Sequence, residues 1–573
     1  MVQQTKTGWA PLHRIVLLWR PQWPLMAAGL VVALAAGLAG LAVMSGAGTH
    51  LAGLVVASEG HAPSHDIAAL AVLLATPALM RLTGLARIVL RYAERLVTHS
   101  ATFRALAGLR VWLFAGIARS AAGGLGFLRS GDLLSRLVGD VDVLDGLYLR
   151  LVVPAGVALL SFVVLVATLV AIPGVPAALV AAIALLFVAA AVVGPVLAAR
   201  AGLHAGPVLN ETVAALRVAV LDVIVGLREI RVFGAEGRMR AMAQSRESAL
   251  FAAQAGLSAR LAAAGLAAFL CGQAILLCLL AAAVGWAPFA VPPLAAIAMV
   301  FVAIAAFEPV SGLPRAGVMA GQMASAAGRV IEAASLPEAA PDPAVPVSLP
   351  PGHALSFDQV GFTWAADRPA VFDGLSLDIP AGRRVAILGP SGSGKSSLAA
   401  LALRLAEPQS GQVRLGGVPV SALAAADLRS RFAWLGQTTH LFSDTIAANL
   451  RLQRAEADEA ELWTALEQAG IAEVVRGLPD GLDTWLGEAG AGLSGGQQRR
   501  IALARVLLSR APVLILDEPC AGLDIDTERA FLETLNTVAD DRTVVLITHR
   551  LLGVERLDRI WRLVGGRATA AAG

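Results

Sequence analysis

Six long apolar segments fill the first half of the chain, and each is long enough to cross a membrane as a helix. They cover residues 23–45, 67–90, 149–172, 175–196, 261–284 and 289–313. A helix needs about 20 mostly apolar residues to cross the ~30 Å hydrocarbon core of a bilayer. Only Pro173 and Gly174 separate the third segment from the fourth, which predicts a tight hairpin. The pattern therefore predicts a membrane domain of six transmembrane helices.

After about residue 350 the pattern changes to short apolar runs, turns and helical periodicity with an ordinary density of charge. This alternation is typical of a soluble α/β domain. We expect a transmembrane domain over residues 1–325, a linker over 326–350 and an α/β domain over 351–573.

Composition supports a membrane protein and excludes some other classes. Of the 573 residues, 57% are hydrophobic and only 15% are charged, which is too apolar for a soluble chain of this length. Because 45 basic residues nearly balance 42 acidic ones, no nucleic-acid partner is indicated. Three scattered cysteines, Cys271, Cys278 and Cys520, favour neither a disulfide framework nor a zinc site.

The basic residues predict the orientation of the six spans. The long connections after the second and fourth spans are rich in arginine, whereas the loop over residues 46–66 has Glu59 and Asp66 but no Lys or Arg. By the positive-inside rule the two arginine-rich connections are cytoplasmic. Both chain termini are then expected in the cytoplasm.

A phosphate-binding loop follows an apolar strand in the second half. The sequence GPSGSGKS fits G-x-x-x-x-G-K-[ST] and precedes an apolar helix. In such a loop the lysine reaches the terminal phosphates and the following hydroxyl binds Mg²⁺. The expected nucleotide ligands are Gly389, Pro390, Ser391, Gly392, Ser393, Gly394, Lys395, Ser396 and Ser397.

A second apolar strand, VLILDEP, ends in two acids. Asp517 suits the Mg²⁺ site together with Ser396, and Glu518 is placed to polarise an attacking water. The alternative, a solvated turn, is less favoured downstream of a phosphate loop. Hydrolysis of a nucleoside triphosphate, ATP with Mg²⁺, is the predicted chemistry.

Between these motifs the sequence LSGGQ, residues 493–497, resembles the signature of ATP-binding cassette (ABC) ATPases. The resemblance implies that Trp364 stacks on adenine, that Gln437 is the Q-loop glutamine and a further Mg²⁺ ligand, and that His549 is the switch histidine. It also implies a D-loop at Asp524, an exporter-type X-loop acid at Glu488, and a signature that contacts the nucleotide of a second subunit. The signature residues concerned are Ser494, Gly495, Gly496 and Gln497.

Four stretches, RYAERLVTHSATFR, SGDLLSRLVGDVDVLDGLYLR, AAFEPVSG and DTWLGEAGAGLSGG, resemble the CydC half of bacterial CydDC transporters. This resemblance implies a type I ABC exporter fold in the bacterial inner membrane, with coupling helices near residues 130–140 and 225–236. It implies a CydD-like partner in a heterodimer, and export of cysteine or glutathione, or movement of haem, for cytochrome bd assembly. Arg95 and His99 match the family's haem-associated region, and any haem b would be non-covalent because no C-x-x-C-H signal is present.

Two further charges lie within apolar spans. Arg81 is deep in the second span and Glu308 is near the inner end of the sixth, so Glu308 is a candidate counter-ion for Arg81. Arg81, Arg95, His99 and Glu308 are the substrate or haem candidates. A structural ion pair for Arg81, snorkelling for Arg95 and a water-facing role for His99 are the competing interpretations.

Two other functions use the same motifs. A homodimeric exporter of lipids or drugs would need a broad apolar cavity. An ATP-binding membrane regulator or haem sensor would not need the hydrolytic residues Glu518 and His549, which are present here.

Overall fold

The structure is a computed structural model that describes most of the chain. The described residues are 9–58, 77–121, 133–134, 136–285, 291, 293–336, 338, 340–365, 367–487, 490, 492–521, 523, 525–538 and 541–571. The chain divides into two compact units, residues 1–117 with 128–336 and residues 118–127 with 337–573. The division at residue 336 falls within the stretch expected to be a linker, and the start of that stretch belongs to a helix that ends at Ala334.

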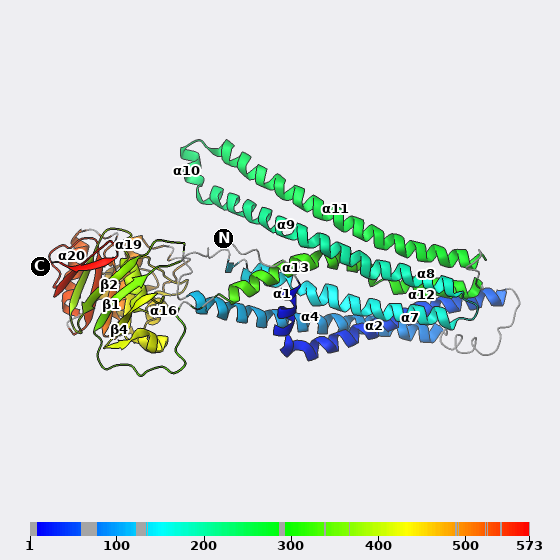
Figure 1. Cartoon of the computed structure of the whole chain (residues 1–573), viewed down its shortest axis with the longest axis horizontal. Coiled ribbons are helices and arrows are strands. Elements are labelled where there is room, and N and C mark those ends of the chain that lie inside the picture. Colours follow the sequence, from blue (N-terminus) through cyan, green and yellow to red (C-terminus); the bar gives the residue numbers. More distant parts are fainter. Residues whose placement is uncertain are drawn as a thin grey trace. The chain divides into compact units, whose positions relative to one another are not determined.

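The first unit is helical throughout its described part (Figure 1). Six of its helical segments are long and apolar enough to cross a membrane, as predicted. The α-helices are α1 (Ala10–Leu18), α2 (Trp23–Ser58), α4 (Pro77–Ala121), α6 (Val141–Val143), α7 (Val153–Ala171), α8 (Ala177–Val188), α9 (Gly194–Val225), α10 (Leu227–Val232), α11 (Glu236–Ala283), α12 (Pro293–Phe307) and α13 (Leu313–Ala334). Short 3₁₀ or π segments η1 (Arg20–Gln22), η3 (Arg136–Asp140), η4 (Leu147–Val152), η5 (Ala189–Val193) and η6 (Val310–Gly312) connect several of them.

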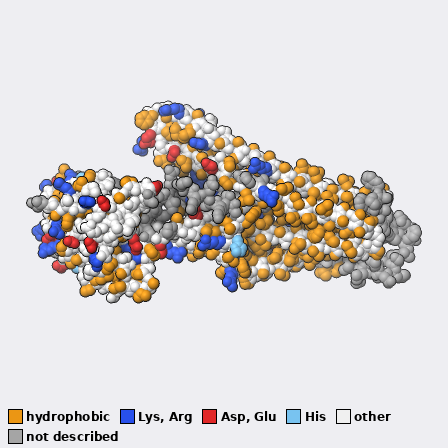
Figure 2. All heavy atoms as spheres, viewed as in Figure 1, with side chains coloured by type: hydrophobic (Ala, Val, Ile, Leu, Met, Phe, Trp, Pro, Cys, Tyr) orange, Lys and Arg blue, Asp and Glu red, His pale blue; other side chains and the backbone are white. Residues whose placement is uncertain are grey.

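Long helices carry the chain well beyond the apolar segments. Helices α9 and α11 run side by side and are joined at one end by the short helix α10, in the region expected to hold a coupling helix (Figure 1). The other expected coupling region, residues 130–140, lies partly outside the described residues. Hydrophobic side chains cover the spanning part of this unit, and charged ones gather near α10 (Figure 2).

The expected hairpin between the third and fourth spans is present. Helix α7 ends at Ala171 and α8 begins at Ala177, with Gly174 at φ +85° in the turn. A positive φ suits glycine because it has no Cβ. The expected start of the second span lies outside the described residues.

Small residues allow α9 and α13 to pack closely. A Cβ added at Gly317 would lie 2.3 Å from the carbonyl oxygen of Pro195, and one at Gly202 would lie 2.2 Å from that of Val318. Close backbone approach through glycines is a common means of packing membrane helices. Much of α13 is accordingly buried, including Gly317, Val318 and Gly321.

The second unit contains two sheets. An antiparallel sheet has the order β2-β1-β4-β5, and a six-stranded, mainly parallel sheet has the order β10-β9-β3-β8-β7-β6. The strands are β1 (Leu355–Phe362), β2 (Phe372–Ile379), β3 (Arg384–Leu388), β4 (Ser410–Leu415), β5 (Val418–Pro419), β6 (Phe432–Leu435), β7 (Val513–Asp517), β8 (Thr543–Thr548), β9 (Arg559–Val564) and β10 (Arg567–Ala570).

Helices pack around these sheets and supply the remaining core. They are α14 (Lys395–Ala402), α15 (Ala425–Ser430), α16 (Ile446–Arg451), α17 (Glu459–Gln468), α18 (Ala472–Arg476), α19 (Gly495–Leu507) and α20 (Ile525–Val538), with 3₁₀ turns η7 (Val420–Ala422) and η8 (Gly481–Asp483).

The parallel strands bring distant motifs to one edge of the sheet. Strands β3, β6, β7 and β8 run parallel, so their carboxyl ends lie along the same edge. Their apolar side chains are almost all buried because both faces of the sheet are covered. Ligands of open α/β sheets bind at this edge. Here it carries the phosphate loop, Gln437, Glu518 and His549.

Candidate functional site

The phosphate loop joins β3 to α14, as predicted. Gly392 and Gly394 have φ values of +80° and +97°. A Cβ at Gly394 would lie 2.6 Å from Val371 and one at Gly389 would lie 2.6 Å from the carbonyl oxygen of Leu563. The loop can therefore adopt this conformation only because these positions lack side chains.

Two polar groups of the loop suit a phosphate ligand. The Lys395 ammonium donates to the carbonyl oxygens of Gly389 and Pro390 at 2.8 and 2.9 Å. The Ser393 hydroxyl is buried and has no hydrogen-bond partner among the described residues. A buried hydroxyl of this kind is costly unless a ligand satisfies it, and a phosphate oxygen would do so.

The magnesium candidates fit a hard divalent cation. Ser396 Oγ donates to Asp517 Oδ2 at 2.6 Å, so the two expected ligands are adjacent. Asp517 is buried, and burial raises the pKa of its carboxyl, opposed by the Ser396 hydrogen bond. In nucleotide sites, Mg²⁺ is commonly bound by one or two protein oxygen ligands, such as these, together with phosphate oxygens.

Glu518 has an unusual backbone conformation at the tip of β7. Its φ is +48°, in the left-handed region that costs most non-glycine residues about 1–3 kcal/mol. Its amide donates to the carbonyl oxygen of Ile547 at 2.8 Å, and Gln437 Nε2 donates to its carboxylate at 3.4 Å. Glu518 and His549 line the same pocket of about 270 Å³. The three expected hydrolytic residues are thus close together.

Trp364 lies beside the start of α14. Its indole Nε1 donates to Ser397 Oγ at 3.0 Å, and its ring meets Phe362 edge to face, with 5.0 Å between ring centroids. The indole is therefore held next to the phosphate loop, where an adenine ring could stack on it.

The signature residues begin α19. Ser494 caps the helix: its Oγ accepts from the Gln497 amide at 3.3 Å, and its own amide donates to Gln497 Oε1 at 2.8 Å. Gly495 and Gly496 form the first turn, so backbone N–H groups are available to an anion there. Asp524 and Glu488 lie outside the described residues.

A second candidate site is a cavity of about 350 Å³ in the first unit, lined mainly by α2, α4 and α7. Arg95, His99 and Glu308 all line it, as do three charged residues that were not predicted: Arg87, Arg91 and Glu94. Among these residues, three arginines face two carboxylates. The cavity therefore carries a net positive charge.

The ion pairs of Glu308 correct one prediction. Its carboxylate oxygens lie 2.8 Å from Arg87 Nη2 and 3.4 Å from Arg91 Nη2, so Arg81 is not its counter-ion. Arg81 also does not line the cavity. Arg87 lies six positions after Arg81, which is a rotation of roughly 240° around a helix. The repeat of arginine at positions 87, 91 and 95 is the signal that would have identified this face.

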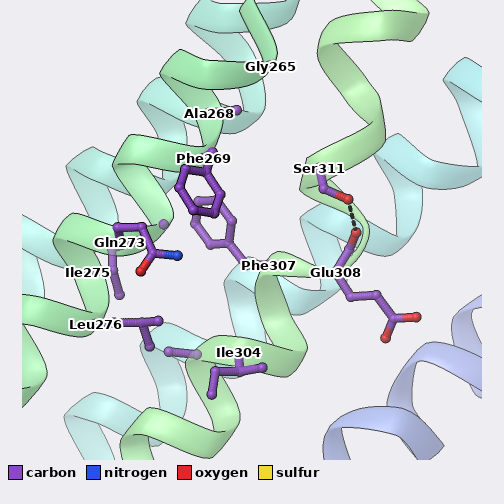
Figure 3. A pocket seen from close by; sticks show the side chains of 12 residues that line it. Gly265, Ala268, Phe269, Gln273, Ile275, Leu276, Ile304, Phe307, Glu308 and Ser311 are labelled. Carbon is purple, nitrogen blue, oxygen red and sulfur yellow. Dashed lines mark hydrogen bonds between the residues drawn. The ribbon is translucent and has the colours of Figure 1, made fainter. Parts of the chain in front are cut away.

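A more apolar pocket of about 290 Å³ lies between α11 and α12 (Figure 3). Phe269, Gln273 and Phe307 line it, and Glu308 and Ser311 line both this pocket and the charged cavity. Ser311 Oγ donates to the Glu308 carbonyl oxygen at 2.8 Å, while the Glu308 side chain extends away from the two phenylalanines (Figure 3). Glu308 is thus shared by the two pockets.

Known proteins match both the second unit and nearly the whole chain. Residues 372–521 match the family model of the ABC transporter domain. The chain is 33% identical to the glutathione/L-cysteine transport system ATP-binding/permease protein CydC of Escherichia coli, over 96% of this chain and 94% of that protein. It is 34% identical to the protein of the same name from Haemophilus influenzae, over 92% and 90%.

Comparison with solved structures also identifies an ABC exporter. A bacterial Atm1-family ABC exporter with ATP bound matches 95% of this chain and 94% of its own, with a TM-score of 0.81 and 25% identity. These matches establish a multi-pass ABC exporter in which ATP hydrolysis is coupled to transport, as the sequence predicted. The chain belongs to the CydC family of ABC exporter subunits.

Proposed function

We propose that the chain pairs with a CydD-like half-transporter and exports glutathione or cysteine across the bacterial inner membrane. The names of the two full-length relatives support this cargo. The observation that carries the proposal is the charged cavity, in which Arg87, Arg91 and Arg95 face Glu94 and Glu308. Glutathione has carboxylates and an ammonium group, so it offers a partner to both kinds of charge.

Hydrolysis requires a base, which we assign to Glu518. Its carboxylate can accept a proton from water, and Gln437 and His549 orient the groups around the terminal phosphate. Lys395 binds that phosphate, and Ser396, Asp517 and Gln437 would hold Mg²⁺, which would offset the charge of the triphosphate. Trp364 holds the adenine. Ser494 to Gln497, with Asp524, serve the nucleotide bound by the partner.

The orientation of the chain is part of the proposal. Both termini and the α9–α10–α11 end lie in the cytoplasm, since arginines at positions 217, 228, 231, 238 and 240 gather there. Closure of the paired cassettes on ATP would then open the transmembrane cavity outward, provided ATP binds the closed state more tightly.

Haem is the second candidate ligand, because one observation favours it. His99 lines the cavity beside Arg95, and its ring lies 5.8 Å from that of Phe103. A histidine can ligate haem iron, and arginines can pair with haem propionates. A titration of haem b into the purified complex tests this: an unchanged Soret spectrum for His99→Ala removes His99 as a ligand.

Uptake into inverted vesicles tests the cargo. Vesicles containing the purified pair are given ATP and labelled glutathione, cysteine or haem, and vesicles with Glu518→Gln are the control. The proposal predicts ATP-dependent uptake of a thiol that the control lacks. Uptake of haem alone, or of neither thiol, would contradict the proposed cargo.

A further inference from the structure

Arg499 is a buried cation that no expected role accounts for. It lies on α19, two residues after the signature, and is only 4% exposed. Its guanidinium is surrounded by the backbone of two other motifs, and every hydrogen bond described for it is to an acceptor of those motifs.

The contacts of Arg499 join the loop after β6 to the end of β7. Nη1 donates to the carbonyl oxygens of Gly436 and Gln437 at 2.7 and 2.9 Å, and to Thr439 Oγ1 at 3.0 Å. Nη2 donates to the carbonyl oxygens of Asp517 and Glu518 at 2.6 and 2.7 Å, and Nε donates to that of Pro519 at 3.4 Å. A planar fork of five N–H groups makes this possible, whereas lysine has three donors at one point.

These contacts act on residues proposed to perform hydrolysis. Glu518 keeps its left-handed backbone only because its surroundings fix it. Its amide is held by Ile547 and its carbonyl by Arg499. Arg499 also holds the backbone of Gln437, whose side chain donates to the Glu518 carboxylate. One guanidinium therefore sets the relative positions of Gln437 and Glu518.

The contacts of Arg499 account for the presence of a buried cation at this place. Burial lowers the pKa of Arg499, which reports the cost of removing the charge from water. An apolar residue of similar volume would avoid that cost, but it would leave the five backbone carbonyls that Arg499 binds without this donor. Because these carbonyls include those of Gln437 and Glu518, the fork geometry of the guanidinium also fixes the backbone of both residues.

We propose that Arg499 is a positioning residue for ATP hydrolysis, which fixes Glu518 and Gln437 from the helix that begins with the signature. The inference rests on the proposed role of Glu518 as base. It goes further in assigning a residue that touches neither nucleotide nor metal. Displacement of the base slows turnover without weakening the phosphate loop that binds ATP.

The test uses the assembled transporter with Arg499→Lys and Arg499→Met, and Arg500→Lys as the matched control. Arg500 lies on the same helix and donates to the carbonyl of Gly470. We expect kcat to fall about 10- to 100-fold in both Arg499 variants, because a misplaced base loses part of the factor of roughly 10²–10⁴ it can supply. KM for ATP should change less than about threefold, and the control should keep wild-type values.

A double-mutant cycle separates positioning from general damage. If Arg499 acts through Glu518, then adding Arg499→Lys to Glu518→Gln should lower the residual turnover by less than about threefold. An equal loss in both backgrounds, or a wild-type kcat for Arg499→Lys, would overturn the inference. A wild-type kcat for Glu518→Gln would instead show that the proposed base is wrong, and the inference would fail with it.

A milder variant covers the case in which the Arg499 variants do not fold. Thr439→Val removes one acceptor of Nη1 and keeps the arginine in place. Loss of one such hydrogen bond predicts a fall in kcat of about two- to tenfold at unchanged KM. An unchanged kcat for Thr439→Val, with no folded Arg499 variant, would count against the inference.

Discussion

Arg404 provides a sharp test of how the second unit holds the chain segment that enters it. The side chain is 1% exposed, follows α14 and lies between the entering segment and α15. It pairs with Asp342 at 3.0 Å and Glu407 at 3.1 Å, and donates to the carbonyl oxygens of Leu423 and Pro341. Asp342 also accepts from the Ala425 amide at 2.9 Å, so the same carboxylate begins α15.

The effect of Arg404→Met can be worked out from these contacts. The two carbonyls would lose a charged donor, at about 1–3 kcal/mol each. The ion pairs add at most about 1 kcal/mol each, since Asp342 and Glu407 are 55% and 36% exposed. Methionine keeps most of the buried stem. The strain of φ +49° at this position is the same for both residues and cancels. The expected loss is about 3–5 kcal/mol.

Hydrogen exchange on the full chain measures this loss locally. A loss of 3 kcal/mol corresponds to exchange more than about 100-fold faster, since 1.4 kcal/mol is a factor of ten. We expect this acceleration in peptides that cover residues 340–347 and 425–430. Arg510→Met is the control, because Arg510 has a 76% exposed side chain and one exposed ion pair. Exchange accelerated less than about tenfold in both peptides would refute the reasoning.

Three further predictions concern the two candidate sites and the helix packing. Asp517→Asn should abolish Mg²⁺-dependent hydrolysis, yet the nucleotide-free variant should be no less stable than wild type at neutral pH. The raised pKa of Asp517 means that its carboxyl binds a proton more tightly in the native state than in the unfolded state. Wild-type stability therefore falls as pH rises through that pKa. In thermal scans, the Tm of Asp517→Asn relative to that of wild type should be higher at neutral pH than at low pH. The opposite trend would contradict this reasoning. Glu308→Gln frees Arg87 and Arg91, so KM for an anionic substrate should fall about two- to tenfold, whereas Arg91→Gln should raise this KM. Equal changes of KM in the two variants would argue against the cavity as the substrate site. Gly317→Val should separate α13 from Pro195 and lower the yield of folded protein in size-exclusion chromatography, while Gly328→Val, with open space around its Cβ, should not.

The prediction of the nucleotide site succeeded because its residues are ordered by local structure. A strand, a glycine loop and a helix place Lys395 and Ser396 in a fixed relation whatever surrounds them. The parallel sheet then sets Asp517 beside Ser396, as the two strand-end motifs indicated. Arg499 was missed because five of its six described acceptors are backbone carbonyls, which leave no mark in the sequence.

The transmembrane cavity was less predictable. Helical periodicity identifies a face of α4, but it does not say which neighbouring helix that face meets. The pairing of Glu308 with Arg81 was therefore wrong, and Arg87 was overlooked although it continues the spacing of Arg91 and Arg95.

The sequence by itself determined the six apolar spans, the α/β unit and the chemistry of ATP hydrolysis, because each depends on periodicity or on residues close together in the chain. Tertiary structure alone decided which arginines neutralise Glu308, how closely α9 and α13 approach, and that one buried guanidinium joins the Gln437 loop to Glu518. These features depend on contacts between segments tens to hundreds of residues apart. Their geometry is set by packing of the whole unit rather than by any local pattern.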